Sequence, residues 1–549
     1  MKRRFRRSPT DDAFVPGPAF DTSRTPPPRV QNVNTTDIPA AVTSACNAMG
    51  EIFNPNDNGY PYMYTRIWPD GWLGFSPWHG AIQMSGRHLD ALLAAEHVFD
   101  IPALESVITA HTKAAFFSLS AGPIPGNHRE PGGPLVAFDE HSIREALHGL
   151  HALVRYRNSD RAHTAAEALI HDIQRLWGSN EDWDEQAIEE AYGMPMVVRP
   201  TFVEGVGRAI GPLVKFHEST RSSEALALAQ QLGDYAATHA FLDDGKYDSE
   251  RFGAHCHSTT CTLSGLTKLA DLTGDQPLLN RTRQFYDRGL PTIRDEVGWV
   301  RERHHRESAG FHPEQGEMNN VGDIIETAVI LGRHFGDSYY QDAERYLRCQ
   351  LLPSQVRDLS FMEEVAGGDE RRGLQTRLLG VFGFSAVYGH LPKGKHEAAP
   401  SLDIVGGATA SLCAAQQAIA PTVNGSTHIN MLFDYESDDI CIESPYTGPV
   451  LRITPKTAGD IHVRIPTWAD IDTITVNSHP AQPLVRNNRL ILFEPQIGQP
   501  IEIGLPLPDM HVQIHHDEHV IEAELRGDSM LAMDDLGAGL AYFPPAHKA

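Results

Sequence analysis

The sequence predicts a mainly α-helical protein with a β domain: an (α/α)6 toroid of helical hairpins followed by an antiparallel β-sandwich. Three observations predict this. Helical hairpins recur from about residue 80, alternating strands replace them near residue 425, and 549 residues exceed what one hydrophobic core usually serves. We therefore expect a flexible N-terminal arm over 1–35, a toroid over 36–424 and a β-sandwich over 425–549.

The first 35 residues are rich in Pro, Arg and Thr and begin with the basic stretch MKRRFRR. No apolar stretch follows it, so we expect neither a signal peptide nor a membrane span. Six cysteines are scattered without a CxxC pair. This usage is typical of reduced thiols, and we expect a cytoplasmic protein.

The hairpins are pairs of amphipathic helices, with apolar residues at i, i+3, i+4 and i+7 in each arm. Five full copies and a sixth, weaker one at the end are expected at 88–119, 142–177, 211–242, 262–290, 323–352 and 406–420. Two copies share a Gly-Asp turn, at Gly274-Asp275 and Gly336-Asp337. In each turn we expect Gly to end the first helix and Asp to cap the second.

The net charge of −25, from 46 basic and 71 acidic residues, argues against certain partners. Nucleic acid and anionic membranes both need a basic surface, so we expect neither as a partner. After residue 425, period-two alternation and turn signals such as Asn-Gly indicate the β domain, which could supply a homodimer surface.

Polar and aromatic side chains gather first in residues 58–92, where six Tyr and Trp residues lie close together in the sequence. Rings beside hydrogen-bonding groups are typical of sugar-binding sites, although such rings also fill cores. The candidate substrate-binding residues here are Tyr64, Arg66, Trp78 and His79.

A second polar stretch, AHCHSTTC, places His255 and His257 at a predicted helix start, with Ser258 or Thr259 as its cap. Cys261 follows four residues later, which also fits zinc. Because HxH without fixed partner spacing is a weak metal signal, we favour a substrate-binding role for both histidines. We expect no metal and no cofactor.

A third stretch, residues 298–320, contains Glu302, Glu307, Glu314 and Glu317, and ends in the adjacent amides Asn319 and Asn320. Two carboxyl groups in one site can divide into an acid and a base. Glycoside cleavage needs such a pair, about 5 Å apart for retention or roughly 6.5–9.5 Å for inversion. Solvated loop charges are the alternative.

We take Glu317, Glu302 and Glu307 as candidate catalytic residues, and both amides as substrate-binding. A fourth stretch, at Gly406-Gly407, places backbone N–H groups at a predicted helix start, where they could meet a polar ligand.

The segments GEMNNVGDIIETAVILGRHFGDSYYQDAERYLRCQLL, HCHSTTCTLSGLTKLADLTGD and VRIPTWADIDTITVNSHPAQP resemble glycoside hydrolase family 127, the non-reducing-end β-L-arabinofuranosidases. The order of these segments is more telling than any single one of them. We take the resemblance to extend over most of residues 55–510. The resemblance implies an (α/α)6 toroid as the catalytic domain, followed by β-sandwich material, and an oligosaccharide substrate.

The sequence departs from that family at its metal. In characterised members zinc sits on a Glu, the Cys two residues later and a later cysteine pair, one of which is the nucleophile. Glu317 matches the Glu, but Asn319 takes the Cys position and Gly406-Gly407 the pair, while Cys413 lies too far along its helix. Without a thiolate that mechanism cannot run.

The sequence therefore predicts a divergent glycosidase that cleaves a non-reducing-end sugar, such as a β-L-arabinofuranoside, by carboxylate acid–base catalysis. Two alternatives remain open. One is a glycan-binding homologue without activity, and the other is a uronate-directed lyase, because the arginines of RERHHRE suit an acidic sugar.

Overall fold

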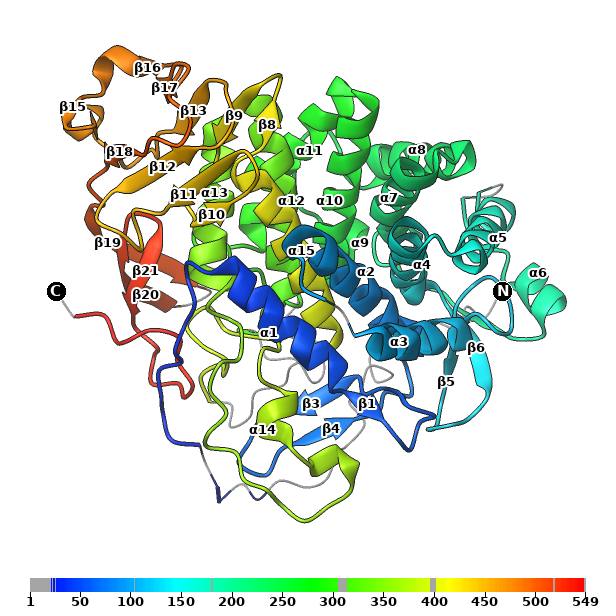
Figure 1. Cartoon of the computed structure of the whole chain (residues 1–549). Helices are drawn as coiled ribbons and strands as arrows, with labels where there is room; N and C mark the ends of the chain where they lie inside the picture. Colours follow the sequence, from blue (N-terminus) through cyan, green and yellow to red (C-terminus); the bar gives the residue numbers. More distant parts are fainter. Residues whose placement is uncertain are drawn as a thin grey trace.

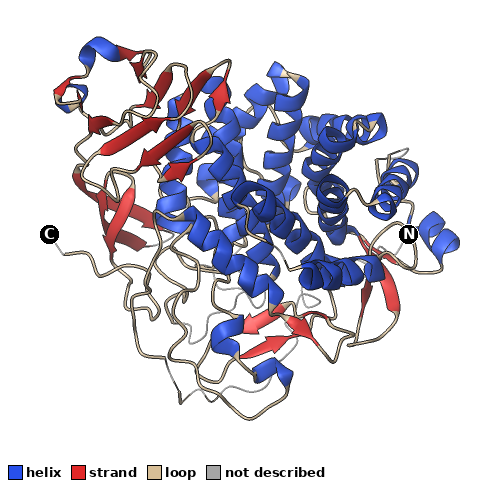
Figure 2. Cartoon of the chain, viewed as in Figure 1, coloured by secondary structure: helices blue, strands red, loops and turns tan. Residues whose placement is uncertain are grey.

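The structure, a computed structural model, describes residues 21–547 except 22, 25, 103, 179–180, 305–313, 395–400 and 517–518. Its larger part is a closed ring of helices, and its smaller part is built of strands (Figures 1 and 2). The predicted fold class, an (α/α)6 toroid with a β domain, is confirmed. No helix among the described residues is long and apolar enough to cross a membrane.

The inner wall of the toroid consists, in the described chain, of six helices, each packed against the next and the last against the first. They are α2 (Ala81–Phe99), α4 (Ile143–Arg157), α7 (Ile210–Thr220), α10 (Cys256–Thr273), α12 (Met318–Phe335) and α15 (Asp403–Ile419). Glycine allows the closest approach: a Cβ on Gly86 of α2 would lie 1.9 Å from the Glu145 carbonyl oxygen of α4.

Each inner helix carries an outer partner. In ring order these are α3 (Glu105–Ser118), α5 (Asp160–Leu176), α8 (Ser223–His239), α11 (Gln276–Arg288), α13 (Asp337–Tyr346) and α1 (Ile38–Gly50). All five full hairpins predicted from the sequence are present. The sixth pair is completed by α1, from the opposite end of the helical domain, which packs on α15 and closes the ring. Shorter helices are α6 (Glu185–Tyr192), α9 (Ser249–Phe252) and α14 (Leu374–Arg377).

The two Gly-Asp turns behave differently. Gly274 has φ +70° and Asp275 accepts the Leu278 N–H, so this turn ends one helix and caps the next as predicted. Asp337 does not cap α13 but is its first residue, and it forms an ion pair with Arg489 of the β domain. The prediction of a cap at Asp337 is therefore wrong.

Small sheets are formed by segments between the toroid helices. They pair β1 (Phe53–Asn54) with β2 (Tyr60–Pro61), β3 (Tyr64–Arg66) with β4 (Trp72–Gly74), and β5 (Gly126–His128) with β6 (Leu135–Asp139) and β7 (Met196–Val197). The β3–β4 hairpin meets the start of α15, because Tyr64 forms a β-bridge with Ser401. Within the segment predicted as an arm, the Gln31 N–H donates to the Ala541 carbonyl.

The β domain contains two larger sheets. One has the order β10 (Tyr435–Glu436), β11 (Ile440–Glu443), β12 (Leu451–Pro455), β18 (Ile501–Gly504), β14 (Thr475–Val476), β15 (His479–Pro480). The other has the order β16 (Val485–Arg486), β17 (Arg489–Leu492), β13 (Ile461–Arg464), β9 (Ser426–Ile429), β8 (Thr422–Val423). All pairs in them are antiparallel except β9 with β13. Alternate residues of β12 are buried, as its period-two pattern predicts.

A third sheet, β19 (Asp509–His516), β20 (His519–Arg526) and β21 (Ser529–Met533), follows at the end of the chain. Its β20–β21 turn packs on the toroid, where Asp528 accepts hydrogen bonds from Arg345 and Trp468. The toroid and the β domain therefore share buried polar contacts as well as apolar ones.

Candidate active site

Polar side chains from several inner helices meet at the end of the ring where these helices begin. We call His255, His257, Glu302, Glu317 and Asn319 the N-terminal cluster. His255 precedes α10, Glu317 precedes α12, and Glu302 lies on the segment that leads to α12. The sequence had indicated all five, and the structure brings them together.

Main-chain hydrogen bonds hold Glu302 between the starts of two helices. Its carbonyl accepts the Cys256 N–H at 3.1 Å, and its own N–H donates to the Gln315 carbonyl at 2.8 Å. β-Bridges join Arg303 to His255 and Arg301 to Gly316. Short extended pairing therefore fixes the carboxyl group of Glu302 against α10 and α12.

Glu302 and Glu317 form a pair around one imidazole. His255 Nε2 lies 3.7 Å from Glu302 Oε1 and 3.6 Å from Glu317 Oε2. The two carboxyl groups therefore flank the same ring nitrogen. Their side chains are 4% and 5% exposed, whereas His255 is 14% exposed, so the imidazole is the more accessible member.

The pKa values of the two carboxyl groups are shifted in opposite directions. Burial, and next the charge of Glu317, raise the pKa of Glu302 well above its usual range. Burial alone would raise the pKa of Glu317 too, but His257 and the hydrogen bonds from His255 and Glu302 bring that pKa well below its usual range. One carboxyl group is thus an acid and its neighbour a carboxylate.

Glu317 stands at the N-cap position of α12, yet its side chain accepts no capping hydrogen bond from that helix. Instead Glu317 Oε1 accepts the Asn319 amide at 2.7 Å and lies 3.4 Å from His257 Nδ1. The Glu317 side chain therefore contacts the cluster and does not cap α12. The N-cap of α10 is His255, whose side chain makes no capping hydrogen bond, so the predicted caps Ser258 and Thr259 are wrong.

Asn319 of α12 and Gly407 of α15 lie side by side. A Cβ on Gly407 would be 2.0 Å from Asn319 Oδ1, and the Asn319 amide touches Glu317. Both glycines lie inside α15, which begins at Asp403, and not at its start as predicted. Gly406 instead lets α15 approach Arg87 and His88 of α2.

Buried ion pairs support the cluster from α2, α4 and α15. Arg87 pairs with Glu145 at 2.9 Å and with Asp403 at 3.2 Å, and all three side chains are at most 7% exposed. Arg208 adds a 2.8 Å contact to Glu145. Burial opposes ionisation of Glu145, but the three arginines around it, Arg208 first, lower its pKa to about 2.

The aromatic residues of 58–92 divide into two sets. Tyr60, Tyr62, Trp68 and Trp72 are at most 5% exposed and pack in the core. Tyr64 and Trp78 stay half-buried, with the Tyr64 hydroxyl 3.2 Å from His79 Nδ1 and the Arg129 guanidinium 4.4 Å from the Trp78 ring.

The polar candidates of this stretch connect to the cluster through histidines. Burial first, and with it nearby charges that include His79, lowers the pKa of His141, whose ring centroid lies 5.5 Å from that of His255. Arg66 is half-buried on β3, opposite Trp72 of β4. The Tyr64–His79 side of the first stretch therefore lies toward the N-terminal cluster.

The remaining candidates occupy different places. Asn320 is buried and donates to the Arg301 carbonyl at 3.0 Å, which anchors the Glu302 segment. Glu314 accepts the Tyr388 hydroxyl at 2.6 Å and lies 3.1 Å from His519 Nε2, on the side of the β domain. Glu307 lies outside the described residues.

Sequence reasoning missed Asp403, Arg87, Glu145 and Arg208. Asp403 begins α15, where Ser401 and Gln83 donate to it, and its charge is one of the causes that raise the pKa of Glu302. A charged residue on an otherwise apolar inner helix was the available signal, because such a residue needs a buried partner.

The sequence matches no protein-family model and no curated protein. Among solved structures, the chain is similar to a GH127 β-L-arabinofuranosidase from Geobacillus stearothermophilus T6, with 14% identity, 90% of this chain and 80% of that one covered, and a TM-score of 0.54. A GH127 β-arabinofuranosidase matches with 12% identity, coverages of 92% and 84%, and a TM-score of 0.55. A third structure, named glycoside hydrolase, matches with 13% identity, coverages of 91% and 83%, and a TM-score of 0.55. At these identities the likeness shows a shared fold.

Proposed function

We propose that this chain is a glycosidase that removes a non-reducing-end sugar from an oligosaccharide, with Glu302 as general acid. The observation that carries the proposal is the pair of buried carboxyl groups, Glu302 and Glu317, that flank His255 Nε2 at 3.7 and 3.6 Å at the end of the ring where the inner helices begin. The shared fold with GH127 β-L-arabinofuranosidases supports it and makes β-L-arabinofuranosides and related glycosides the first substrates to test.

Glu302, whose pKa burial and the charge of Glu317 raise well above its usual range, gives its proton to the departing glycosidic oxygen. Glu317 remains the carboxylate that holds this proton in place, with Asn319 and His257 against its other oxygen. His255, the exposed member, is placed to contact sugar hydroxyl groups.

A second carboxylate must act from the other side of the anomeric carbon, about 5 Å or roughly 6.5–9.5 Å from the acid. Glu317 flanks the same His255 nitrogen as Glu302, so in this arrangement it lies on the same side. Asp403 is the further carboxylate that acts on Glu302, from the α15 wall. We assign it the role of base or nucleophile, with Arg87 as its ion-pair partner.

In this proposal the chain is a relative of family 127 that lacks the catalytic cysteines and uses carboxyl groups in their place. Asn319 and Gly407 occupy adjoining space, and the asparagine amide contacts Glu317 where that family places zinc. Glycines at the place of the cysteine pair supply no thiolate nucleophile, so the carboxyl groups perform the catalysis.

The test is turnover by the purified full-length chain on nitrophenyl glycosides and natural oligosaccharides, with Glu302→Gln, Asp403→Asn and the control Glu314→Gln. Glu314 is a buried glutamate of the same segment that points toward the β domain. We expect cleavage that is lost in the first two variants and kept in the third. Ligand-induced thermal stabilisation without turnover of any sugar would instead indicate a glycan-binding protein.

One observation favours a second candidate, the uronate-directed lyase. Arg303 Nε lies 3.8 Å from Glu302 Oε1 and its side chain is 20% exposed, so a cation stands beside the acid pair. A lyase would release an unsaturated uronate that absorbs in the near ultraviolet, whereas a hydrolase adds water and gives no such product.

A further inference from the structure

A second cluster lies one helical turn further along the ring axis from the acid pair. His257 and Cys261 occupy positions i and i+4 on α10, and Asp323 faces them from α12. One donor atom of each residue lies within 4.8 Å of the other two, and all three residues are buried. Spacing of i, i+4 places two side chains on one face of a helix.

The imidazole of His257 stands between two carboxylates. Its Nδ1 is 3.4 Å from Glu317 Oε1 and its Nε2 is 3.5 Å from Asp323 Oδ2. The residue is 1% exposed, and its Nε2 makes no hydrogen bond to any described residue. A buried polar atom without a hydrogen bond is costly, so a ligand is expected at this nitrogen.

We propose that His257 Nε2, Cys261 Sγ and Asp323 Oδ2 bind a zinc ion. Nitrogen, thiolate and carboxylate oxygen are the donors that zinc prefers, and around a tetrahedral zinc they lie about 3.2–3.8 Å apart. The observed 3.5 Å between nitrogen and oxygen fits that spacing, and Cys261 closes the third side within 4.8 Å.

The neighbours of the three donors suit the ion. With Nε2 on the metal, the His257 Nδ1–H points at Glu317, the carboxylate–histidine arrangement that fixes the ring of a zinc ligand. The Thr260 hydroxyl donates to Asp323 Oδ2 at 2.9 Å and orients that oxygen. This position differs from the Glu317–Asn319–Gly407 place, for which the sequence predicts no metal.

Arg144 is the competing cation, because its Nη2 lies 3.7 Å from Asp323. It approaches through Oδ1, beyond hydrogen-bond distance, and leaves Oδ2 to His257 and Thr260. Arg144 is also engaged at 3.2 Å by Glu145. Its positive charge therefore offsets part of the negative charge of the donor set.

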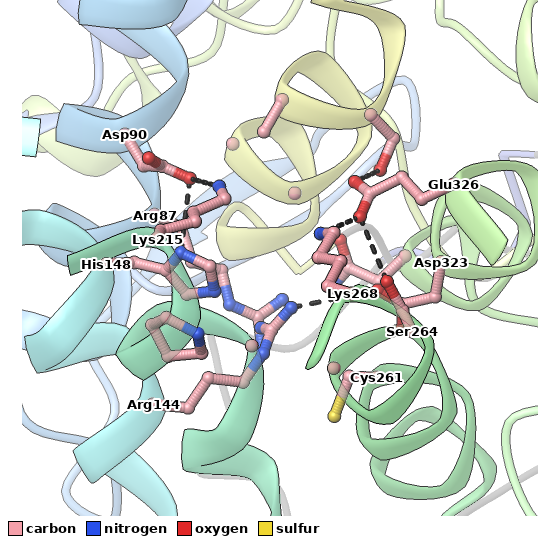
Figure 3. Close-up of a pocket in the computed structure, with 18 residues that line it drawn as sticks. Arg87, Asp90, Arg144, His148, Lys215, Cys261, Ser264, Lys268, Asp323 and Glu326 are labelled. Carbon is pink, nitrogen blue, oxygen red and sulfur yellow. Dashed lines mark hydrogen bonds and ion pairs between the residues drawn. The ribbon is translucent and has the colours of Figure 1, made fainter. Parts of the chain in front are cut away.

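An ion can reach this place along the ring axis. A narrow cavity of about 30 Å³, lined by Cys261 and Asp323, extends between the inner helices, which is room for roughly two water molecules (Figure 3). Its lining also includes Lys215 and Lys268, whose side chains are 26% and 23% exposed and are paired with Asp90 and Glu326. Solvent thus touches the far end of the cavity.

The test uses the purified full-length chain, with metal content measured after equilibration with zinc, and cobalt(II) as a spectroscopic substitute. We expect one zinc per chain and a near-ultraviolet cobalt–thiolate absorption band, both lost in Cys261→Ser. Cys256→Ser, which changes a buried cysteine on the same helix outside the cluster, should keep both.

X-ray absorption of the zinc-loaded wild type requires no variant and covers the case in which Cys261→Ser does not fold. A sulfur neighbour at about 2.3 Å is expected. Absence of stoichiometric zinc, a shell of nitrogen and oxygen only, or a cobalt band that survives Cys261→Ser would overturn the proposal and leave Arg144 as the cation of this site. These readouts do not depend on turnover, so they remain valid whatever the glycoside assays give.

Discussion

Asn319 links the acid pair to helix α15. Its Nδ2 donates to Glu317 Oε1 at 2.7 Å, while its Oδ1 occupies the space that a side chain on Gly407 would need, 2.0 Å from the position of a Cβ. The amide therefore fits only because residue 407 has no side chain. The two positions form one structural unit, although they are far apart in the sequence.

Gly407→Ala should destabilise the protein by about 1–3 kcal/mol, because the added methyl group displaces the Asn319 amide from Glu317. Adding Asn319→Ala removes the clash, so the double variant should lose less stability than the two single changes together. Urea unfolding of the four proteins in this cycle measures the coupling. Additive losses would contradict the contact.

A buried ion network joins the toroid to the β domain through Glu344. This carboxylate accepts from Arg348 at 3.0 Å, from the Leu432 N–H at 3.0 Å and from Arg464. The side chains of all three charged residues are fully buried, and Arg348 lies 3.9 Å from the rings of both Phe433 and Tyr446.

Glu344→Gln should lower the free energy of unfolding by about 3–5 kcal/mol, because it leaves two buried arginines without their counter-charge. The matched control is Glu443→Gln, which removes an exposed partner of Arg452 and should cost at most about 1 kcal/mol. Equal effects in urea unfolding would show that the network contributes no more than a surface pair.

Buried histidines make stability depend on pH. Burial lowers the pKa of His88 to about 4 and those of His148 and His390 to about 3, from an ordinary value of 6.5. Below pH 6.5 the unfolded chain binds protons that the folded chain does not. The free energy of unfolding should therefore fall as pH decreases from 6.5 toward these lowered pKa values. Above pH 6.5 the histidines are neutral in both states, so they should cause no such loss.

Each of these histidines should contribute up to about 1.4 kcal/mol per pH unit within that window. Urea unfolding at several pH values measures the slope, and His390→Phe should reduce it, since burial is the sole cause of that shift. A slope that stays unchanged in His390→Phe would show that this imidazole titrates normally.

The helical hairpins could be predicted because their signal is local. Apolar residues at helical spacing mark both arms of each pair, and the Gly274-Asp275 turn carries its own stop and cap. Helix α1 was not recognised as a ring member, because its partner α15 lies at the other end of the helical domain and only ring closure brings them together.

The residues of the candidate site also fall into those that local sequence signals indicate and those that only tertiary contacts reveal. Glu302, Glu317, His255 and His257 could be predicted because they lie in polar segments near helix starts, where the ring gathers functional groups. Asp403 and Arg87 were missed, because a charged residue on an inner helix signals only that it needs a buried partner, and only the structure shows that these two meet across the ring. Tertiary contacts decide the role of such residues.

The most direct test of the central claim, that Glu302 is the general acid, is the dependence of Glu302→Gln on the leaving group. On a natural glycoside the variant should lose about 10²–10⁴-fold in kcat, because the departing oxygen needs a proton. On a dinitrophenyl glycoside, whose leaving group needs none, it should retain most of the wild-type rate and no longer lose activity at alkaline pH. Equal losses on both substrates, or full activity on both, would contradict the assignment of Glu302.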